Sequence, residues 1–251
     1  MNLNGKVALV TGSAQRVGRT IALSLAQRGC HLVVHYRQSR TEALETVRRA
    51  ESLGVKVLCL KADLQKASSV RSLFQEIRRT FKRCDILVNN AAVFFKTPFR
   101  SLTETDWDTT IDANLKGPFL CALEGGKWMG RQGGGKIVNI ADWCGIKPYA
   151  DYLPYCVSKA GVIALTKALA VELAPHVQVN CVAPGPVLMP KGFSKKEARQ
   201  VKGLTLLKRI GKPDDVAQAV LFFLESTDFA TGTTLFIEGG ELLVSAGSPY
   251  V

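Results

Sequence analysis

The sequence lacks the features that mark most metal-binding, secreted and membrane-spanning proteins. Its seven cysteines form no Cys-x-x-Cys motif, and most lie in or beside apolar runs. This pattern is typical of reduced thiols and argues against disulfides and a structural zinc site. No apolar stretch reaches the ~20 residues that cross a bilayer. The first residues run directly into a strand-like segment, which leaves no room for a signal peptide. We therefore expect a soluble, cytoplasmic protein with no metal and no membrane partner.

Long basic runs are also absent, although the formal net charge is +12. No run of basic residues exceeds two, so a nucleic-acid partner is not expected. Two interpretations of the charge stay open: a solvated basic surface, or a basic mouth that attracts an anionic cofactor.

Strand-like and helix-like segments alternate along the chain. Short apolar segments predict strands at 6–10, 31–35, 56–60, 86–88, 136–140, 177–182 and 235–237. Between them, apolar residues recur at helical spacing, most clearly over 70–81. Continuously apolar strands joined by helices predict an α/β fold, a Rossmann-type doubly wound parallel sheet flanked by helices. No linker interrupts residues 1–251, so we expect a single domain, with a lid or insertion near 189–207.

A glycine-rich turn follows the first predicted strand. It contains Gly12, Arg16, Val17 and Gly18 and opens the next helix. Glycine allows a tight turn and close approach to a pyrophosphate, whose charge is favoured at a helix N-terminus. Taken alone, the segment also fits an ordinary β–α turn.

This turn resembles the Thr-Gly-x-x-x-Gly-x-Gly cofactor loop of the short-chain dehydrogenase/reductase family, except that Arg16 replaces the middle glycine. Further family motifs follow in order, and the resemblance covers almost the whole chain. It implies a small-molecule substrate, a homotetramer and a nicotinamide cofactor. The cofactor would be bound by Gly12, Arg16, Val17, Gly18, Asp63, Leu64, Asn90, Ala91, Tyr155, Lys159, Pro184 and Gly185.

The end of the second predicted strand indicates which nicotinamide cofactor is used. NAD enzymes usually place an acidic residue there, on the ribose 2′-hydroxyl. Here the first acid is Glu42, whereas Arg37 and Ser39 can offer charge and hydrogen bonds to a 2′-phosphate. The sequence therefore predicts NADP(H); the alternative is an exposed arginine with no ligand.

Tyr155 and Lys159 lie four residues apart in a predicted helix and so share a face. A free tyrosine ionises near pH ~10, and a neighbouring cation lowers that pKa. We expect the pair to move a proton while the nicotinamide transfers hydride. The family resemblance adds Asn114 to the proton relay; a helix-kinking asparagine satisfied by backbone is the alternative.

The position where most family members carry a serine is occupied by Asp142, 13 residues before Tyr155. Pteridine reductases resemble this sequence at three places, namely Asp142, Arg16 and residues 35–39. They also place an aromatic residue at the position of Phe94, where it sandwiches the pterin. An acid suits protonation of a ring nitrogen, because a carboxylate would repel a developing alkoxide. A turn-capping Asp142 and a core Phe94 remain alternatives.

The sequence therefore predicts an NADPH-dependent reductase of oxidised pterins, such as dihydropterin or dihydrofolate. Its catalytic residues would be Tyr155, Lys159, Asp142 and Asn114, and its substrate would be held by Arg16, Phe94, Asp142 and Tyr155. A carbonyl reductase of 3-oxoacyl thioesters or small ketones is the nearest alternative. A catalytically silent nucleotide- or nucleic-acid-binding protein is the alternative from another class.

Overall fold

The computed structural model describes residues 1–189 and 194–244, which build one seven-stranded parallel sheet. The strand order is β3-β2-β1-β4-β5-β6-β7. The bounds are β1 (Val7–Val10), β2 (His31–Tyr36), β3 (Val57–Lys61), β4 (Ile86–Asn89), β5 (Gly135–Ile140), β6 (Val177–Pro184) and β7 (Thr234–Ile237). The chain winds outward from β1 in one direction to β3 and then in the other from β4 to β7. The predicted doubly wound Rossmann-type α/β fold is thus confirmed.

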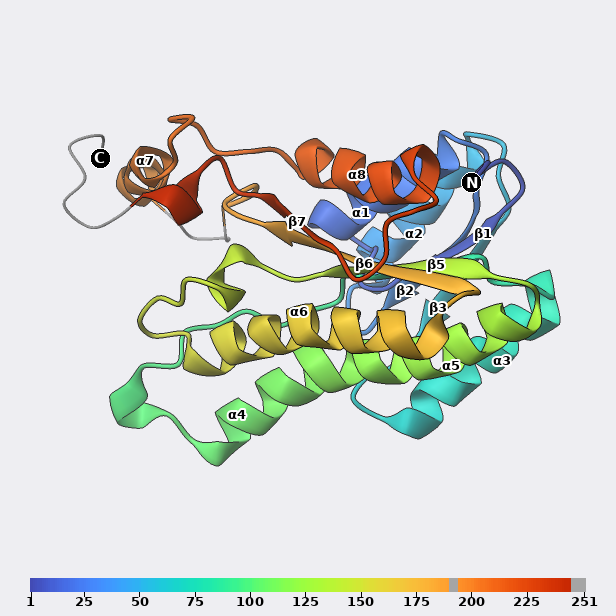
Figure 1. The fold of residues 1–251 in the computed structure, drawn as a ribbon, viewed down its shortest axis with the longest axis horizontal. Coiled ribbons are helices and arrows are strands. Elements are labelled where there is room, and N and C mark those ends of the chain that lie inside the picture. The colour runs from blue at the N-terminus through green and yellow to red at the C-terminus, as the bar shows by residue number, and fades with distance from the viewer. Residues whose placement is uncertain (190–193, 245–251) are drawn as a thin grey trace.

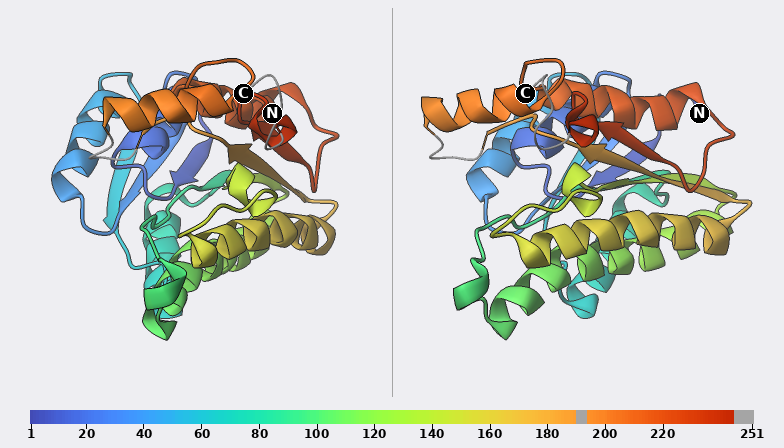
Figure 2. Two further views of the ribbon diagram at one scale, coloured as in Figure 1. Left: turned by 90° about the vertical axis from the view of Figure 1, so that its left-hand side faces the viewer. Right: turned by 60° about the vertical axis from the view of Figure 1, so that its left-hand side comes forward.

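Helices cover both faces of the sheet (Figures 1 and 2). One face carries α1 (Arg16–Ala26), α2 (Arg40–Glu51) and α8 (Pro213–Leu221). The other carries α3 (Ala67–Phe81), α5 (Gly117–Arg131) and α6 (Leu153–Leu173). A shorter helix, α4 (Glu104–Ile111), continues through a π-helical turn (Asp112–Lys116) into α5.

The strands divide the core into two halves because neighbouring residues of a strand point to opposite faces. In β1, Ala8 and Val10 pack with the α1 side, and Val7 and Leu9 pack with the α3 side. All four are buried. This two-sided burial explains why the strands read as uninterrupted apolar runs.

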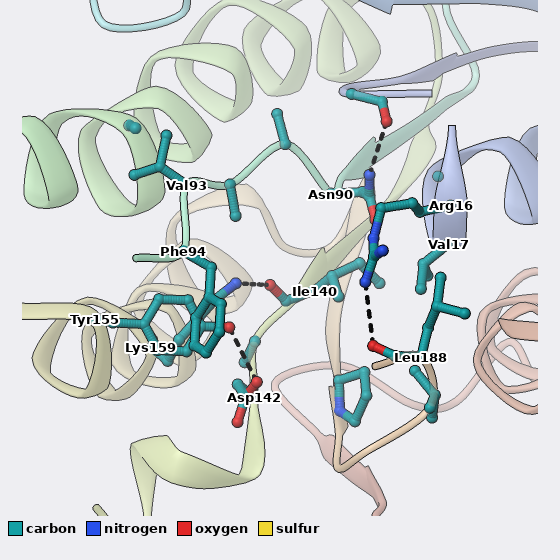
Figure 3. A pocket seen from close by; sticks show the side chains of 18 of the residues that line it. Arg16, Val17, Asn90, Val93, Phe94, Ile140, Asp142, Tyr155, Lys159 and Leu188 are labelled. Carbon is teal, nitrogen blue, oxygen red and sulfur yellow. Dashed lines mark hydrogen bonds between the residues drawn. The ribbon is translucent and has the colours of Figure 1, made fainter. Parts of the chain in front are cut away.

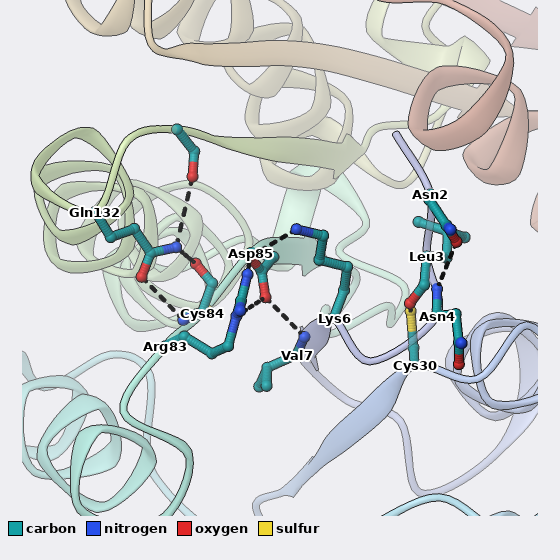
Figure 4. A network of polar contacts seen from close by, with 11 residues as sticks. Asn2, Leu3, Asn4, Lys6, Val7, Cys30, Arg83, Cys84, Asp85 and Gln132 are labelled. Carbon is teal, nitrogen blue, oxygen red and sulfur yellow. Dashed lines mark hydrogen bonds and ion pairs between the residues drawn. The ribbon is translucent and has the colours of Figure 1, made fainter.

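Asp85, just before β4, ties the amino ends of β1 and β4 together (Figure 4). Its carboxylate is buried and accepts hydrogen bonds from the Val7 backbone N–H at 2.9 Å and from two Arg83 nitrogens at 2.8 and 2.6 Å. Lys6 adds a longer ion pair of 3.8 Å. The carboxyl ends of the same strands are thereby held side by side at the opposite edge of the sheet.

The predicted lid at 189–207 is partly described. Residues 190–193 lie outside the described residues, and α7 (Lys195–Leu204) follows them. The lid role of this segment stays a prediction. Within the described parts of the chain, all seven cysteines are free, and no helix is long and apolar enough to cross a bilayer.

Candidate active site

A cleft of about 760 Å³ opens where the loops after β1 to β6 meet at the carboxyl edge of the sheet. Every residue predicted to bind cofactor or substrate lines it, as Figure 3 shows in part. The residues are Gly12, Arg16, Val17, Gly18, Arg37, Ser39, Asp63, Leu64, Asn90, Ala91, Phe94, Asp142, Tyr155, Lys159, Pro184 and Gly185. Asn114 lies behind the wall of the cleft.

The loop after β1 is locked to the loop after β4 by side-chain hydrogen bonds. The Thr11 hydroxyl accepts from the backbone N–H groups of Asn90 and Ala91 at 2.9 and 3.0 Å. The Asn90 amide donates back to the carbonyls of Thr11 and Gly12 at 2.9 and 3.2 Å. A Cβ on Gly18 would lie 2.4 Å from both the Asn90 amide nitrogen and the Gly12 carbonyl oxygen. Glycine is therefore required at this position.

His35 supports the same loop, a role that the sequence did not reveal. Its Nδ1 accepts from the Gly12 N–H at 3.0 Å, while its Nε2 lies 3.2 Å from the Ala62 carbonyl oxygen. A proton on Nε2 satisfies both contacts, so the ring is neutral. Burial lowers the pKa of His35 to about 4, which keeps the ring neutral at physiological pH.

Arg16 adopts a left-handed backbone conformation (φ 55°) at the entrance to α1. Its guanidinium donates to the carbonyls of Leu188 and Met189 at 3.1 and 3.3 Å, so the side chain spans the cleft (Figure 3). The N-cap Gln15 makes no side-chain cap, and the first turn of α1 carries no acid. The first N–H groups of α1 are therefore available to a phosphate.

The far end of the cleft holds the residues predicted to select the cofactor. Arg37 is half-exposed and lies 4.0 Å from Asp63, and the Ser39 hydroxyl accepts from Gln15 at 3.5 Å. Asp63 is thus the counter-ion of Arg37. The Arg37 guanidinium, the Ser39 hydroxyl and the uncapped N–H groups at the start of α1 all offer charge or hydrogen bonds to an anionic ligand in this cleft.

The chemical centre lies at the start of α6 (Figure 3). The Tyr155 hydroxyl donates to the Asp142 carboxylate at 2.9 Å. Lys159 donates to the Ile140 carbonyl at 2.9 Å, and its Nζ lies 5.6 Å from the centre of the Tyr155 ring. Both α6 side chains are buried. The predicted juxtaposition of phenol, ammonium and carboxylate is present.

The pKa of Tyr155 is not lowered, contrary to the sequence-based expectation. Burial raises the pKa of Tyr155 well above its ordinary value, and the Asp142 carboxylate raises it further. Burial also lowers the pKa of Lys159. The ammonium does not offset these effects because it is bonded to the Ile140 carbonyl rather than to the phenol. Tyr155 is therefore protonated at neutral pH, and in the ligand-free cleft it holds its proton more tightly than a free tyrosine does.

The Asp142 carboxylate accepts hydrogen bonds from two groups. One carboxylate oxygen accepts from Tyr155, and the other accepts from the Cys144 N–H at 2.9 Å, where it caps a 3-10 turn (Trp143–Gly145). The capping role and the active-site role are therefore compatible, and the cap fixes the carboxylate that faces the phenol.

Asn114 is buried in the π-helical turn, and its side chain is fully engaged. Its amide oxygen accepts from the Val93 N–H at 2.8 Å, and its amide nitrogen donates to the Val93 carbonyl at 3.0 Å and to Ser158 at 3.3 Å. Asn114 therefore anchors the segment that carries Phe94. Its place in a proton relay stays a prediction.

Phe94 lies at the mouth of the cleft rather than in the core, with 42% of its surface exposed. It stacks on Tyr152 (centroids 4.6 Å apart, planes at 10°) and meets Tyr155 edge-on at 4.8 Å. Tyr149 continues the cluster towards Trp143. The cleft around Asp142 is thus lined by aromatic side chains, of which the sequence analysis named Phe94 and Tyr155 and missed Trp143, Tyr149 and Tyr152.

Comparisons with known proteins agree with this geometry. A family model described as enoyl-(acyl carrier protein) reductase matches residues 12–241. The chain is 36% identical to the (2S)-[(R)-hydroxy(phenyl)methyl]succinyl-CoA dehydrogenase subunit BbsD of Thauera aromatica, over 97% of this chain and 99% of that protein. It is also 36% identical to the 3-oxoacyl-[acyl-carrier-protein] reductase FabG of Staphylococcus epidermidis, over 94% of this chain and 98% of that protein.

A solved structure of acetoin dehydrogenase from Enterobacter cloacae superimposes with a TM-score of 0.88. It is 31% identical, and the match covers 98% of both chains. The sheet order, the Tyr155–Lys159 pair and these full-length matches lead to one conclusion: the chain belongs to the short-chain dehydrogenase/reductase family of oxidoreductases.

Proposed function

We propose that this protein is an NADPH-dependent reductase of oxidised pterins, such as dihydropterin or dihydrofolate. The observation that carries the proposal is the hydrogen bond from Tyr155 to Asp142, with the carboxylate at the position where most of the family carries serine. A carboxylate there disfavours a developing alkoxide and favours a ring nitrogen that receives a proton. The exposed ring of Phe94 beside Tyr155 offers a stacking surface for a flat heterocycle.

In this mechanism bound NADPH supplies the hydride. Tyr155 donates its proton to the adjacent ring nitrogen, and the Lys159 ammonium, 5.6 Å from the centre of the ring, stabilises the phenolate that is left. Asp142 orients the phenol and is itself held by the Cys144 N–H. Lys159 would hold the nicotinamide ribose, and Phe94 and Arg16 would hold the heterocycle.

The use of NADP(H) is part of the proposal. Arg37, paired with Asp63, and Ser39 support it, because both line the cleft just after β2 and can offer charge and hydrogen bonds to a 2′-phosphate. A homotetramer with helix interfaces is also proposed, supported by large apolar side chains exposed on α5 and α6, namely Phe119, Val157 and Val171. Sedimentation analysis of the purified chain tests this assembly.

A small-molecule substrate, no nucleic-acid partner and a cytoplasmic location complete the proposal. The seven free cysteines suit a reducing compartment. Salt-dependent binding of RNA or DNA that survives saturating NADPH would instead support the nucleic-acid-binding alternative.

A 3-oxoacyl thioester reductase is the second candidate, because two full-length relatives at 36% identity are named for acyl-carrier-protein and coenzyme A substrates. In that reaction Tyr155 would protonate a carbonyl oxygen, and Asp142 would have to act in its protonated form.

The test follows NADPH oxidation with dihydropterin, dihydrofolate and a 3-oxoacyl thioester offered side by side. Fast turnover of a pterin supports the first proposal, and turnover of the thioester alone replaces it with the second. Asp142→Asn keeps the acceptor for the Cys144 N–H and removes only the acid, so it isolates the role of the carboxylate. With Asp142→Ser we expect pterin turnover to fall and ketone turnover to rise.

A further inference from the structure

The substrate end of the cleft contains a second acid that none of the family motifs includes. Glu241 opens a short 3-10 turn (Glu241–Leu243) after β7 and lines the same cleft as Asp142 and Trp143. Only 5% of its surface is exposed. One of its carboxylate oxygens, Oε2, is buried without a hydrogen-bond partner in the described structure.

The backbone of this turn is fixed from two directions. Lys147, from the loop between β5 and α6, donates to the Glu241 carbonyl at 3.1 Å and also to the Val244 carbonyl. Glu238 accepts from the Leu242 N–H through its side chain at 3.0 Å and from the Glu241 N–H through its carbonyl at 3.4 Å. The turn that places Glu241 in the lining of the cleft therefore has a fixed backbone.

An unpartnered buried carboxyl is destabilising, because no hydrogen bond replaces its lost water. Burial raises the pKa of Glu241 to about 7, and the nearby carboxylates of Glu238 and Asp142 act in the same direction against Lys147. The Lys147 ammonium is already bonded to two backbone carbonyls. A ligand in the cleft that donates a hydrogen bond to the Glu241 carboxyl would supply the missing partner and explain why an unpaired acid lies there.

We propose that Glu241 is a substrate-binding residue, whose unpaired oxygen accepts a hydrogen bond from an N–H donor of the substrate. The chemistry that fits is an amidine-type group, such as the 2-aminopyrimidine edge of a pterin. The reacting end of a 3-oxoacyl thioester has carbonyl acceptors and no such donor. The inference rests on the proposed function and specifies which part of the substrate the acid recognises.

The test is the steady-state kinetics of Glu241→Gln, with Glu76→Gln as a matched surface control on α3. We expect the KM for dihydropterin to rise about 10- to 100-fold, the range for a hydrogen bond to a charged group. The kcat, the KM for NADPH and the KM for a small diketone, which has no N–H donor, should stay within about twofold. An unchanged KM for dihydropterin would show that Glu241 does not bind the substrate.

A direct binding measurement separates this inference from the proposed function. Benzamidine carries an amidine group on a phenyl ring and is not a pterin, and its binding is measured by isothermal titration calorimetry. If the wild type reduces no pterin, the proposed function fails, and benzamidine still tests Glu241. Loss of benzamidine binding in Glu241→Gln supports the donor site, and equal binding refutes it.

If Glu241→Gln does not fold, Glu241→Asp replaces it in both measurements. This variant keeps the charge and withdraws the carboxylate by one methylene. The KM for dihydropterin and the Kd for benzamidine should then rise together, and unchanged values would overturn the proposal.

Discussion

Replacing Glu241 by glutamine should change how the stability of the ligand-free protein depends on pH. Burial raises the pKa of this carboxyl from 4.5 to about 7 in the folded chain. Between these two values the folded state binds more protons than the unfolded state, so Glu241 makes the fold less stable as the pH rises. The penalty begins above pH 4.5 and is complete above pH 7. Glutamine does not titrate and lacks this dependence.

The size of the effect follows from the two pKa values. Between pH 5 and pH 8.5, a shift from 4.5 to about 7 is equivalent to a loss of about 2.5 kcal/mol. For a chain of this size that free energy equals roughly 5–10 °C in Tm. The glutamine amide has its own packing and hydrogen-bonding cost, but this cost is the same at both pH values.

The measurement is urea unfolding of the wild type, Glu241→Gln and the control Glu76→Gln at pH 5 and pH 8.5. Relative to the wild type, Glu241→Gln should gain about 2.5 kcal/mol on going from pH 5 to pH 8.5. The free energy of unfolding of the control Glu76→Gln should change with pH by the same amount as that of the wild type. If the free energy of unfolding of Glu241→Gln also changed with pH by the same amount as that of the wild type, the reasoning would be refuted. The Glu241 carboxyl would then have its ordinary pKa in the folded chain.

Three further changes test the rest of the cleft. Tyr155→Phe removes the proton donor, so kcat should fall about 10²- to 10⁴-fold, far more than NADPH affinity, followed by its fluorescence, changes. Arg37→Ala should raise the KM for NADPH at least tenfold and leave the KM for NADH unaltered; equal effects on both cofactors would contradict the 2′-phosphate assignment. Gly18→Ala should lower Tm and NADPH affinity, because its Cβ collides with Asn90, whereas Gly130→Ala, with nothing within 4 Å, should be neutral or stabilising in a thermal melt.

The fold was predictable because its signals are local and repeated. In α3, the apolar residues at helical spacing, Val70, Leu73, Phe74 and Ile77, are the ones buried. The last predicted strand, 235–237, lies within β7 (Thr234–Ile237). Each strand also ends in a loop at the same edge of the sheet, so the motifs on these loops had to meet in one cleft.

The cleft was less predictable wherever contacts between distant segments determine its properties. The direction of the Tyr155 pKa depends on burial and on where the Lys159 ammonium is bonded, and the four-residue spacing of the two side chains determines neither. His35 becomes an acceptor for Gly12 only once β2 pairs with β1. Glu241 reaches the cleft because β7 pairs with β6 and its turn is held by Lys147, and neither contact follows from the residues next to it in the sequence.

The ionisable groups of the cleft constrain its ligands further than the net charge of +12 does. Among the described lining residues, Arg16 and Arg37 lie on the loops after β1 and β2, and Arg37 pairs with Asp63. Asp142 and Glu241 line the proposed substrate end, where Lys159 is the cation beside Tyr155. An anionic cofactor is therefore attracted at one end, whereas a substrate with its own carboxylate near the reacting atom meets two acids at the other. We therefore expect the substrate to be a neutral heterocycle rich in N–H donors, or an anion that keeps its charge outside the aromatic lining around Asp142.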